Sequence, residues 1–155
     1  MDVEALEFSN LDSINAPLRT RMRLRAFHQL DRVSNLWIMP LPLPLSTPTH
    51  KGLFAAKRYN DLDADVLLEL VPVLETVDLT LPAGYALAEM PQNQQFSTPF
   101  GEYALRFEPI AGGLRIRREV RYRQRFVHHD VFLEFKKFYL KMLDADDALL
   151  ALKKK

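Results

Sequence analysis

The fold is decided by the stretch GEYALRFEPIAGGLRIRREVRYRQ, residues 101–124. Its first arm carries apolar side chains at every second position, namely Tyr103, Leu105 and Phe107. The second arm repeats this period, with Leu114, Ile116, Val120 and Tyr122 on one face. Such alternation marks strands with one buried face. The Gly112-Gly113 pair supplies the turn, because glycine adopts positive φ angles without steric cost. The stretch therefore predicts a long β-hairpin.

Two polar residues interrupt the apolar face of the second arm. Arg118 and Gln124 stand where the alternation calls for apolar side chains. An interruption of this kind predicts a β-bulge or a strand that projects beyond its sheet.

One amphipathic helix is expected after the hairpin, from Val131 to Leu143. Asp130 stands at the expected N-cap position and Glu134 in the first turn. An apolar stripe recurs at helical spacing and consists of Phe132, Phe135, Tyr139 and Met142. We expect this helix to cover the open end or one face of a sandwich.

The helix is expected to fray near residues 144–147. Residues 149–152 then predict a last strand, or alternatively a helical continuation of the Ala148-Leu149-Leu150 run.

Further strands are expected upstream. Residues 18–26 alternate strictly between apolar side chains and arginines, which predicts a half-buried strand. Other strands are predicted at 36–39, 53–59, 76–81 and 85–90. The alternating prolines of 40–44 remove amide donors, so that stretch is expected at an edge or crossover. The fold class is therefore mainly β, an antiparallel β-sandwich with one short C-terminal amphipathic helix.

Length and charge narrow the class of protein. The chain has 155 residues, with 21 basic against 20 acidic side chains and no cysteine. We expect one β-sandwich domain over residues 1–155, cut from the C-terminal end of a larger protein.

The balanced charge argues against binding to nucleic acid. No apolar run reaches the roughly 20 residues that a membrane span needs, so no membrane insertion is expected. Residues 1–7 do not resemble a signal peptide.

Rows of arginines are the candidate binding surface. They lie on the exposed faces of two predicted strands and comprise Arg19, Arg21, Arg23, Arg25, Arg115, Arg117, Arg121, Arg123 and Arg125. They could bind an acidic partner, a phosphate-bearing polymer or an anionic glycan. The alternative is a solvated face whose arginines pair across strands with aspartates and glutamates.

Other residue patterns give little chemistry. His128-His129-Asp130 has metal-ligand residue types, but adjacent histidines on a strand point to opposite faces, so no metal site is predicted. The serines include no Gly-x-Ser-x-Gly elbow, and the absence of cysteine excludes a thiol nucleophile. The sequence therefore predicts no catalytic residue, no cofactor and no enzyme activity.

The chain resembles the C-terminal region of large bacterial transglutaminase-like proteins, over residues 36–155. The resemblance rests on Leu81-Pro82-Ala83-Gly84-Tyr85, a polar loop with Pro91 and Phe96, Phe100-Gly101-Glu102-Tyr103, an arginine-rich strand, Phe132-x-x-Phe135-x-x-Phe138, an aspartate within 144–147, and Leu-x-Leu-Lys-Lys at 150–154. Such proteins carry an N-terminal β domain of unknown function, a papain-type transglutaminase-like core and a β-rich C-terminal domain.

The resemblance implies an accessory role. The catalytic Cys-His-Asp of the family belongs to the core, so no catalytic residue transfers to this chain. The implied partner is the neighbouring transglutaminase-like domain, and the arginine face or the proline edge at 40–44 is expected to be the docking surface for it. The implied location is periplasmic or otherwise extracytoplasmic. The alternative function is a glycan or acidic-polymer binding module that uses the arginine rows with Tyr103 or Tyr122.

Overall fold

The structure is a computed structural model that describes residues 2–25, 31–45, 47, 57–68 and 70–155. It forms two units, Met1–Asp31 and Arg32–Lys155. Residues 26–30 lie outside the described residues. The expectation of one domain over residues 1–155 therefore stays a prediction, and each unit is described by itself.

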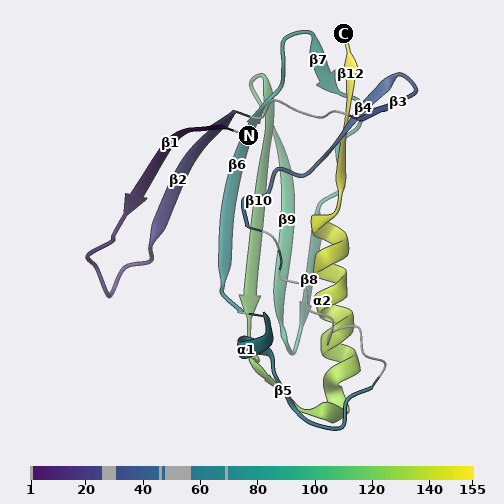
Figure 1. The fold of residues 1–155 in the computed structure, drawn as a ribbon. Helices are drawn as coiled ribbons and strands as arrows, with labels where there is room; N and C mark the ends of the chain where they lie inside the picture. Colours follow the sequence, from purple (N-terminus) through teal and green to yellow (C-terminus); the bar gives the residue numbers. More distant parts are fainter. Residues whose placement is uncertain (1, 26–30, 46, 48–56, 69) are drawn as a thin grey trace. The chain divides into compact units, whose positions relative to one another are not determined.

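Unit 1 is a β-hairpin of two antiparallel strands (Figure 1), β1 (Asp2–Ser9) and β2 (Arg19–Arg25). Leu6 pairs with Met22 and Phe8 with Thr20, so these side chains share one face. We call Val3, Leu6, Phe8, Met22 and Leu24 the hairpin apolar face. All five side chains are exposed within the described structure. A two-stranded hairpin is at best marginally stable alone in water.

The largest sheet of unit 2 has the strand order β6-β10-β9-β8. Its strands are β6 (Val73–Thr80), β8 (Gln94–Thr98), β9 (Gly101–Ile110) and β10 (Gly113–Tyr122). The predicted hairpin is confirmed as β9 and β10, and Gly112 at its turn has a φ of +76°. The ladder between them runs without a register shift from Gly113 to Tyr122. Of the two alternatives predicted for this strand, the β-bulge is therefore wrong over Gly113–Tyr122.

Helix α2 (Phe132–Asp146) follows a 3-10 turn, η2 (His129–Val131). The predicted apolar stripe is confirmed, since Phe132, Phe135, Tyr139 and Met142 are buried, together with Phe138 and Ala145. The helix begins one residue later and ends three residues later than expected. Asp130 is not its N-cap, because Asp130 lies inside η2, whose N-cap is His128.

A second sheet contains the last strand of the chain. Its order is β3-β4-β12-β7, with β3 (Asp31–Val33), β4 (Leu36–Pro40), β7 (Tyr85–Leu87) and β12 (Leu149–Lys154). Leu150 pairs with Met39 on one side of β12, and Leu152 with Leu87 on the other. Residues 149–152 are thus a strand that pairs along its length with β4 and, at Leu152, also with β7.

Unit 2 also contains a short two-stranded sheet. It pairs β5 (Leu62–Asp63) with β11 (Phe126–Val127), and α1 (Ala64–Leu68) follows β5 directly. The strand expected at 53–59 falls partly on 48–56, which lie outside the described residues, and 57–59 are not strand.

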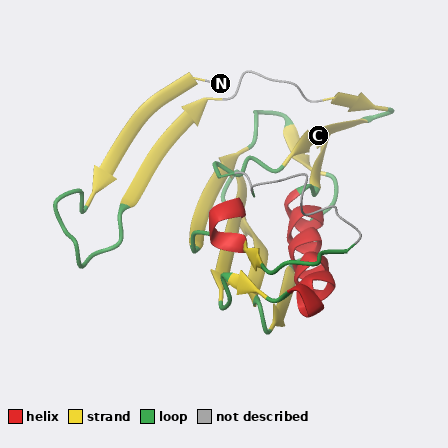
Figure 2. Cartoon of the chain, turned by 60° about the horizontal axis from the view of Figure 1, so that its bottom comes forward, coloured by secondary structure: helices red, strands yellow, loops and turns green. Residues whose placement is uncertain are grey.

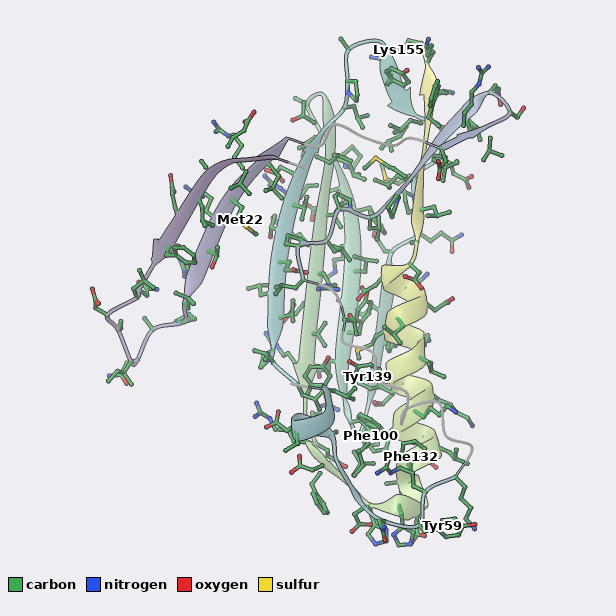
Figure 3. All side chains as sticks on the ribbon, in the orientation of Figure 1. Met22, Tyr59, Phe100, Phe132, Tyr139 and Lys155 are labelled. Carbon is green, nitrogen blue, oxygen red and sulfur yellow. The ribbon has the colours of Figure 1, made fainter. Side chains whose placement is uncertain are left out.

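The core of unit 2 lies between the large sheet and α2, which runs along that sheet (Figure 2). Aromatic side chains join the two layers. The Phe96 and Phe138 rings are 5.9 Å apart and the Phe100 and Phe135 rings 5.6 Å apart, both edge to face. Figure 3 labels Phe100, Phe132 and Tyr139 where helix and sheet meet. The fold class is therefore confirmed as mainly β and antiparallel, with one C-terminal helix that covers a sheet face. Among the described residues, no helix combines the length and apolar character needed to cross a membrane.

Candidate functional site

Arg118 on β10 is a charged side chain inside the core, only 2% exposed. It faces inward because residues 114, 116, 118 and 120 share the buried face of β10. Its Nε donates to Glu75 Oε2 at 2.7 Å and its Nη1 to Asp146 Oδ2 at 2.6 Å. Its Nη2 donates to the backbone carbonyl of Leu45. One guanidinium thus ties together β6, β10, the end of α2 and the chain near Leu45.

The two carboxylates that face Arg118 have further donors. The Tyr103 hydroxyl donates to Asp146 Oδ1 at 2.6 Å, and Thr47 Oγ1 donates to Asp146 Oδ2. The backbone amide of Leu45 donates to Glu75 Oε1 at 2.9 Å. The single positive charge and these neutral donors together satisfy the buried carboxylate of Glu75 and the partly buried carboxylate of Asp146.

Burial changes proton affinities around Arg118. Burial raises the pKa of Glu75, and the charge of Arg118 opposes this rise. The pKa of Tyr103 is raised by burial and by its hydrogen bond to Asp146. An arginine stays protonated and accepts no hydrogen bond, so it cannot serve as an acid or base here. Arg118 therefore serves this cluster as a fixed cation and hydrogen-bond donor. The one sequence feature that pointed to this cluster was an arginine at a position where the strand alternation calls for an apolar side chain.

The arginines of β10 and the following residues lie beside carboxylates. The ion pairs are Arg115–Asp78 at 2.6 Å, Arg117–Glu108 at 3.8 Å, Arg121–Glu119 at 2.6 Å, Arg123–Glu102, and Arg125–Asp65 at 2.9 Å. The Arg115 side chain donates two hydrogen bonds to Asp78 and lowers the pKa of that carboxyl. This row fits the paired, solvated sheet face better than a row of free cations.

The arginines of β2 belong to the other unit. Arg19, Arg21 and Arg23 share the face opposite the hairpin apolar face, and Arg21 pairs with Glu7 at 3.8 Å. The side chain of Arg25 lies outside the described residues. The two units are not placed relative to each other, so the two arginine rows are described separately. Their role as a docking surface stays a prediction.

A cluster of imidazoles and carboxylates lies where β11 leads into η2. His129 Nδ1 is 2.8 Å and His128 Nε2 is 3.6 Å from Asp61 Oδ1. The backbone amide of His129 also donates to Asp61 Oδ1, at 2.9 Å. The hydrogen bonds from His129 lower the pKa of Asp61. The expectation that the two histidines point apart is wrong, because they lie in a turn and not in a strand. Their ring centroids are 4.2 Å apart.

A cavity beside the C-terminal end of α2 is not lined by the side chains that a nucleophilic site needs. It has a volume of about 150 Å³ and is lined by Pro91, Gln92, Gln94, Leu105, Lys141, Asp144, Ala145 and Ala148. A nucleophilic mechanism needs a nucleophile beside a base. This lining, as described, contains no serine, threonine or histidine. His28 and His50 lie outside the described residues.

Comparisons with known proteins address the fold and the family. A solved structure named "putative protease" from Parabacteroides distasonis ATCC 8503 is similar, with a TM-score of 0.59 and 18% sequence identity. The similarity covers 77% of this chain and 24% of that one, so the chain spans about a quarter of the length of that protein. No curated protein matches the sequence. The family model of a domain of unknown function with a solved structure (DUF3858) matches residues 50–152, more than half of the chain. The chain belongs to the DUF3858 family.

Proposed function

We propose that this chain is a non-catalytic accessory domain that packs against and positions a neighbouring catalytic domain of the transglutaminase-like, papain type. The observation that carries the proposal is the match to a quarter of a longer protein named as a protease. A fold that occurs as one segment of a longer chain has a neighbouring domain to contact. Interfaces of this kind typically bury about 600–1,500 Å².

The hairpin apolar face is the surface that fits this contact. Leu6 and Phe8 are each 49% exposed and Met22 is 42% exposed, although all three are large apolar side chains. Contiguous apolar surface of this kind marks interaction sites on soluble proteins. The hairpin lies outside residues 50–152, the part that the family model matches. We assign it to the contact with the catalytic neighbour.

The arginine row of β10 and the residues after it gives less support to the alternative function, a glycan or acidic-polymer binding module. A glycan or acidic-polymer site needs guanidinium groups that are free to bind a ligand. Arg115 instead makes two hydrogen bonds to Asp78, and the other described members of that row lie within ion-pair distance of a carboxylate. We therefore prefer the accessory role.

The first experiment is to read the gene around the codon for residue 1. A papain-type core encoded directly upstream, in the same reading frame, is the expected result. The second experiment measures association between that core and this chain as separate polypeptides, by sedimentation velocity. The absence of such a core, or of association at 100-micromolar-scale concentrations (roughly 5 kcal/mol of binding free energy), would count against the proposal.

Matched variants locate the contact. Phe8→Lys with Met22→Lys places two charges on the hairpin apolar face. Ala5→Lys with Ser9→Lys places the same two charges on its opposite face. We expect the first pair to weaken association about tenfold or more, because losing a buried apolar anchor costs more than ~1 kcal/mol. The second pair should change association much less.

A further inference from the structure

We propose that Asp61, His128 and His129 bind a divalent transition-metal ion such as Zn²⁺, with Asp130 orienting both imidazoles. The three ligand residues each offer one atom, and these atoms lie within 4.8 Å of one another. The set combines two imidazoles with a carboxylate, which suits Zn²⁺, Ni²⁺, Co²⁺ or Cu²⁺ better than Ca²⁺ or Mg²⁺.

The spacing around Asp61 fits a small ion. Zinc bonds of about 2.0–2.1 Å to nitrogen and oxygen place tetrahedral ligand atoms about 3.3–3.4 Å apart. The distance from Asp61 Oδ1 to His128 Nε2 is 3.6 Å, and the distance to His129 Nδ1 is 2.8 Å. Shifts of less than an ångström would therefore open the His129 hydrogen bond and admit the ion.

Asp130 occupies the position of an outer carboxylate. Its Oδ2 is 3.3 Å from His128 Nδ1, and its Oδ1 is 3.2 Å from His129 Nε2. These are the ring nitrogens opposite those that face Asp61. Metal-binding histidines usually donate their second N–H to a carboxylate, which fixes the tautomer and orients the ring. His128 Nδ1 also accepts a hydrogen bond from the backbone amide of Asp130, at 3.5 Å, so metal binding requires His128 to exchange that bond for donation to Asp130 Oδ2. After this exchange, His128 Nε2 and His129 Nδ1 are the ring nitrogens that face Asp61.

Backbone pairing between β5 and β11 holds together the two segments that carry the metal-binding residues. Asp61 directly precedes β5, whose Leu62 pairs with Val127 of β11, and both of these side chains are buried. His128 follows Val127 and is the N-cap of η2. The ligands thus come from two segments that the β5–β11 pairing joins before any ion binds. Three protein ligands leave the fourth position of a tetrahedral ion to water.

Calorimetric titration of the tag-free, metal-stripped chain with ZnCl₂ tests the proposal. We expect one saturable site, and no saturable site for MgCl₂. His129→Gln should weaken binding at least tenfold, and Asp130→Asn about 10–100-fold, as for other outer-shell partners. Glu119→Gln, an exposed carboxylate outside the cluster, should leave affinity unchanged. Far-UV circular dichroism checks that each variant is folded.

A second measurement stays informative if a variant folds poorly. Cobalt(II) added to the wild-type chain should give the visible absorption of a tetrahedral site, and Zn²⁺ should displace it. Absence of saturable Zn²⁺ binding up to millimolar concentration would overturn the proposal. So would binding that persists in His128→Gln with His129→Gln, or that is lost in His28→Gln with His50→Gln.

Discussion

Arg118 and Asp146 lie 28 residues apart in the sequence, yet Arg118 Nη1 is 2.6 Å from Asp146 Oδ2 in the structure. The contact joins the middle of β10 to the last residue of α2. It explains why the helix continues beyond Leu143, where fraying was expected. Asp146 also accepts from Tyr103 and Thr47, so the final turn is held to the sheet from several directions.

Replacing Arg118 should destabilise the fold strongly. Arg118→Met keeps an apolar stem but leaves buried Glu75 and partly buried Asp146 without their cation. Removing one partner of a buried ion pair costs about 3–5 kcal/mol. Urea unfolding should show this loss. The control is Arg115→Met, which breaks the exposed pair with Asp78 and should cost about 1 kcal/mol or less. Equal losses in both variants would contradict the role given to Arg118.

Gly113 should not tolerate a side chain. A Cβ at this position would overlap the backbone carbonyl of Leu79 on the neighbouring strand β6. Gly113→Ala should therefore force the β6–β10 ladder apart, at a cost of about 1–3 kcal/mol in the free energy of unfolding. Ala111→Gly, in the exposed turn beside it, should change stability by about 0.5 kcal/mol or less. Thermal unfolding of the two variants compares them directly.

Buried tyrosines predict a loss of stability at high pH. Burial raises the pKa of Tyr122 from 10.0 to about 12, and burial also raises the pKa values of Tyr103 and Tyr139. A raised pKa means that the folded state favours the neutral phenol. The contribution is fully present below pH 10, the unfolded value, and is lost as pH rises through about 12. For Tyr122 it amounts to about 2–3 kcal/mol.

Urea unfolding between pH 8 and about 11.5, with tyrosinate absorbance as a second signal, checks this. The free energy of unfolding should fall above pH 10. It should fall less steeply with pH in Tyr122→Phe than in the wild type. An identical slope in the two proteins would show that Tyr122 does not contribute.

The pKa of Asp78 should depend directly on its pairing with Arg115. Hydrogen bonds from Arg115 lower the pKa of Asp78, so the pairing stabilises the fold above the ordinary carboxyl range and loses this effect as pH falls. In Arg115→Gln, the Asp78 pKa measured by NMR should move up toward its ordinary value. Arg121→Gln, which disrupts the Glu119 pair, should leave Asp78 unchanged. High salt should weaken the difference, because both side chains are exposed.

Local patterns predicted the parts of the fold that short-range geometry controls. The alternation around Leu105 and Ile116 predicted β9 and β10, and the spacing of Phe135 and Tyr139 predicted the buried face of α2. The helix boundaries were less accurate, because Asp130 is an N-cap residue type that lies inside a 3-10 turn. The same local view treated Arg118 as an interruption of the strand, although it keeps the register and points inward.

The sequence by itself determined an antiparallel, mainly β chain with one C-terminal amphipathic helix, since side-chain periodicity and a two-glycine turn are properties of neighbouring residues. The tertiary structure alone decided that residues 149–152 pair with β4 and β7, that Arg118 meets Glu75 and Asp146, and that Asp61 meets His128 and His129. The physical reason is that strand pairing and the neutralisation of buried charge depend on groups that are far apart in sequence. No local pattern specifies such partners, and the packing of α2 and β5 against their neighbours brings them together.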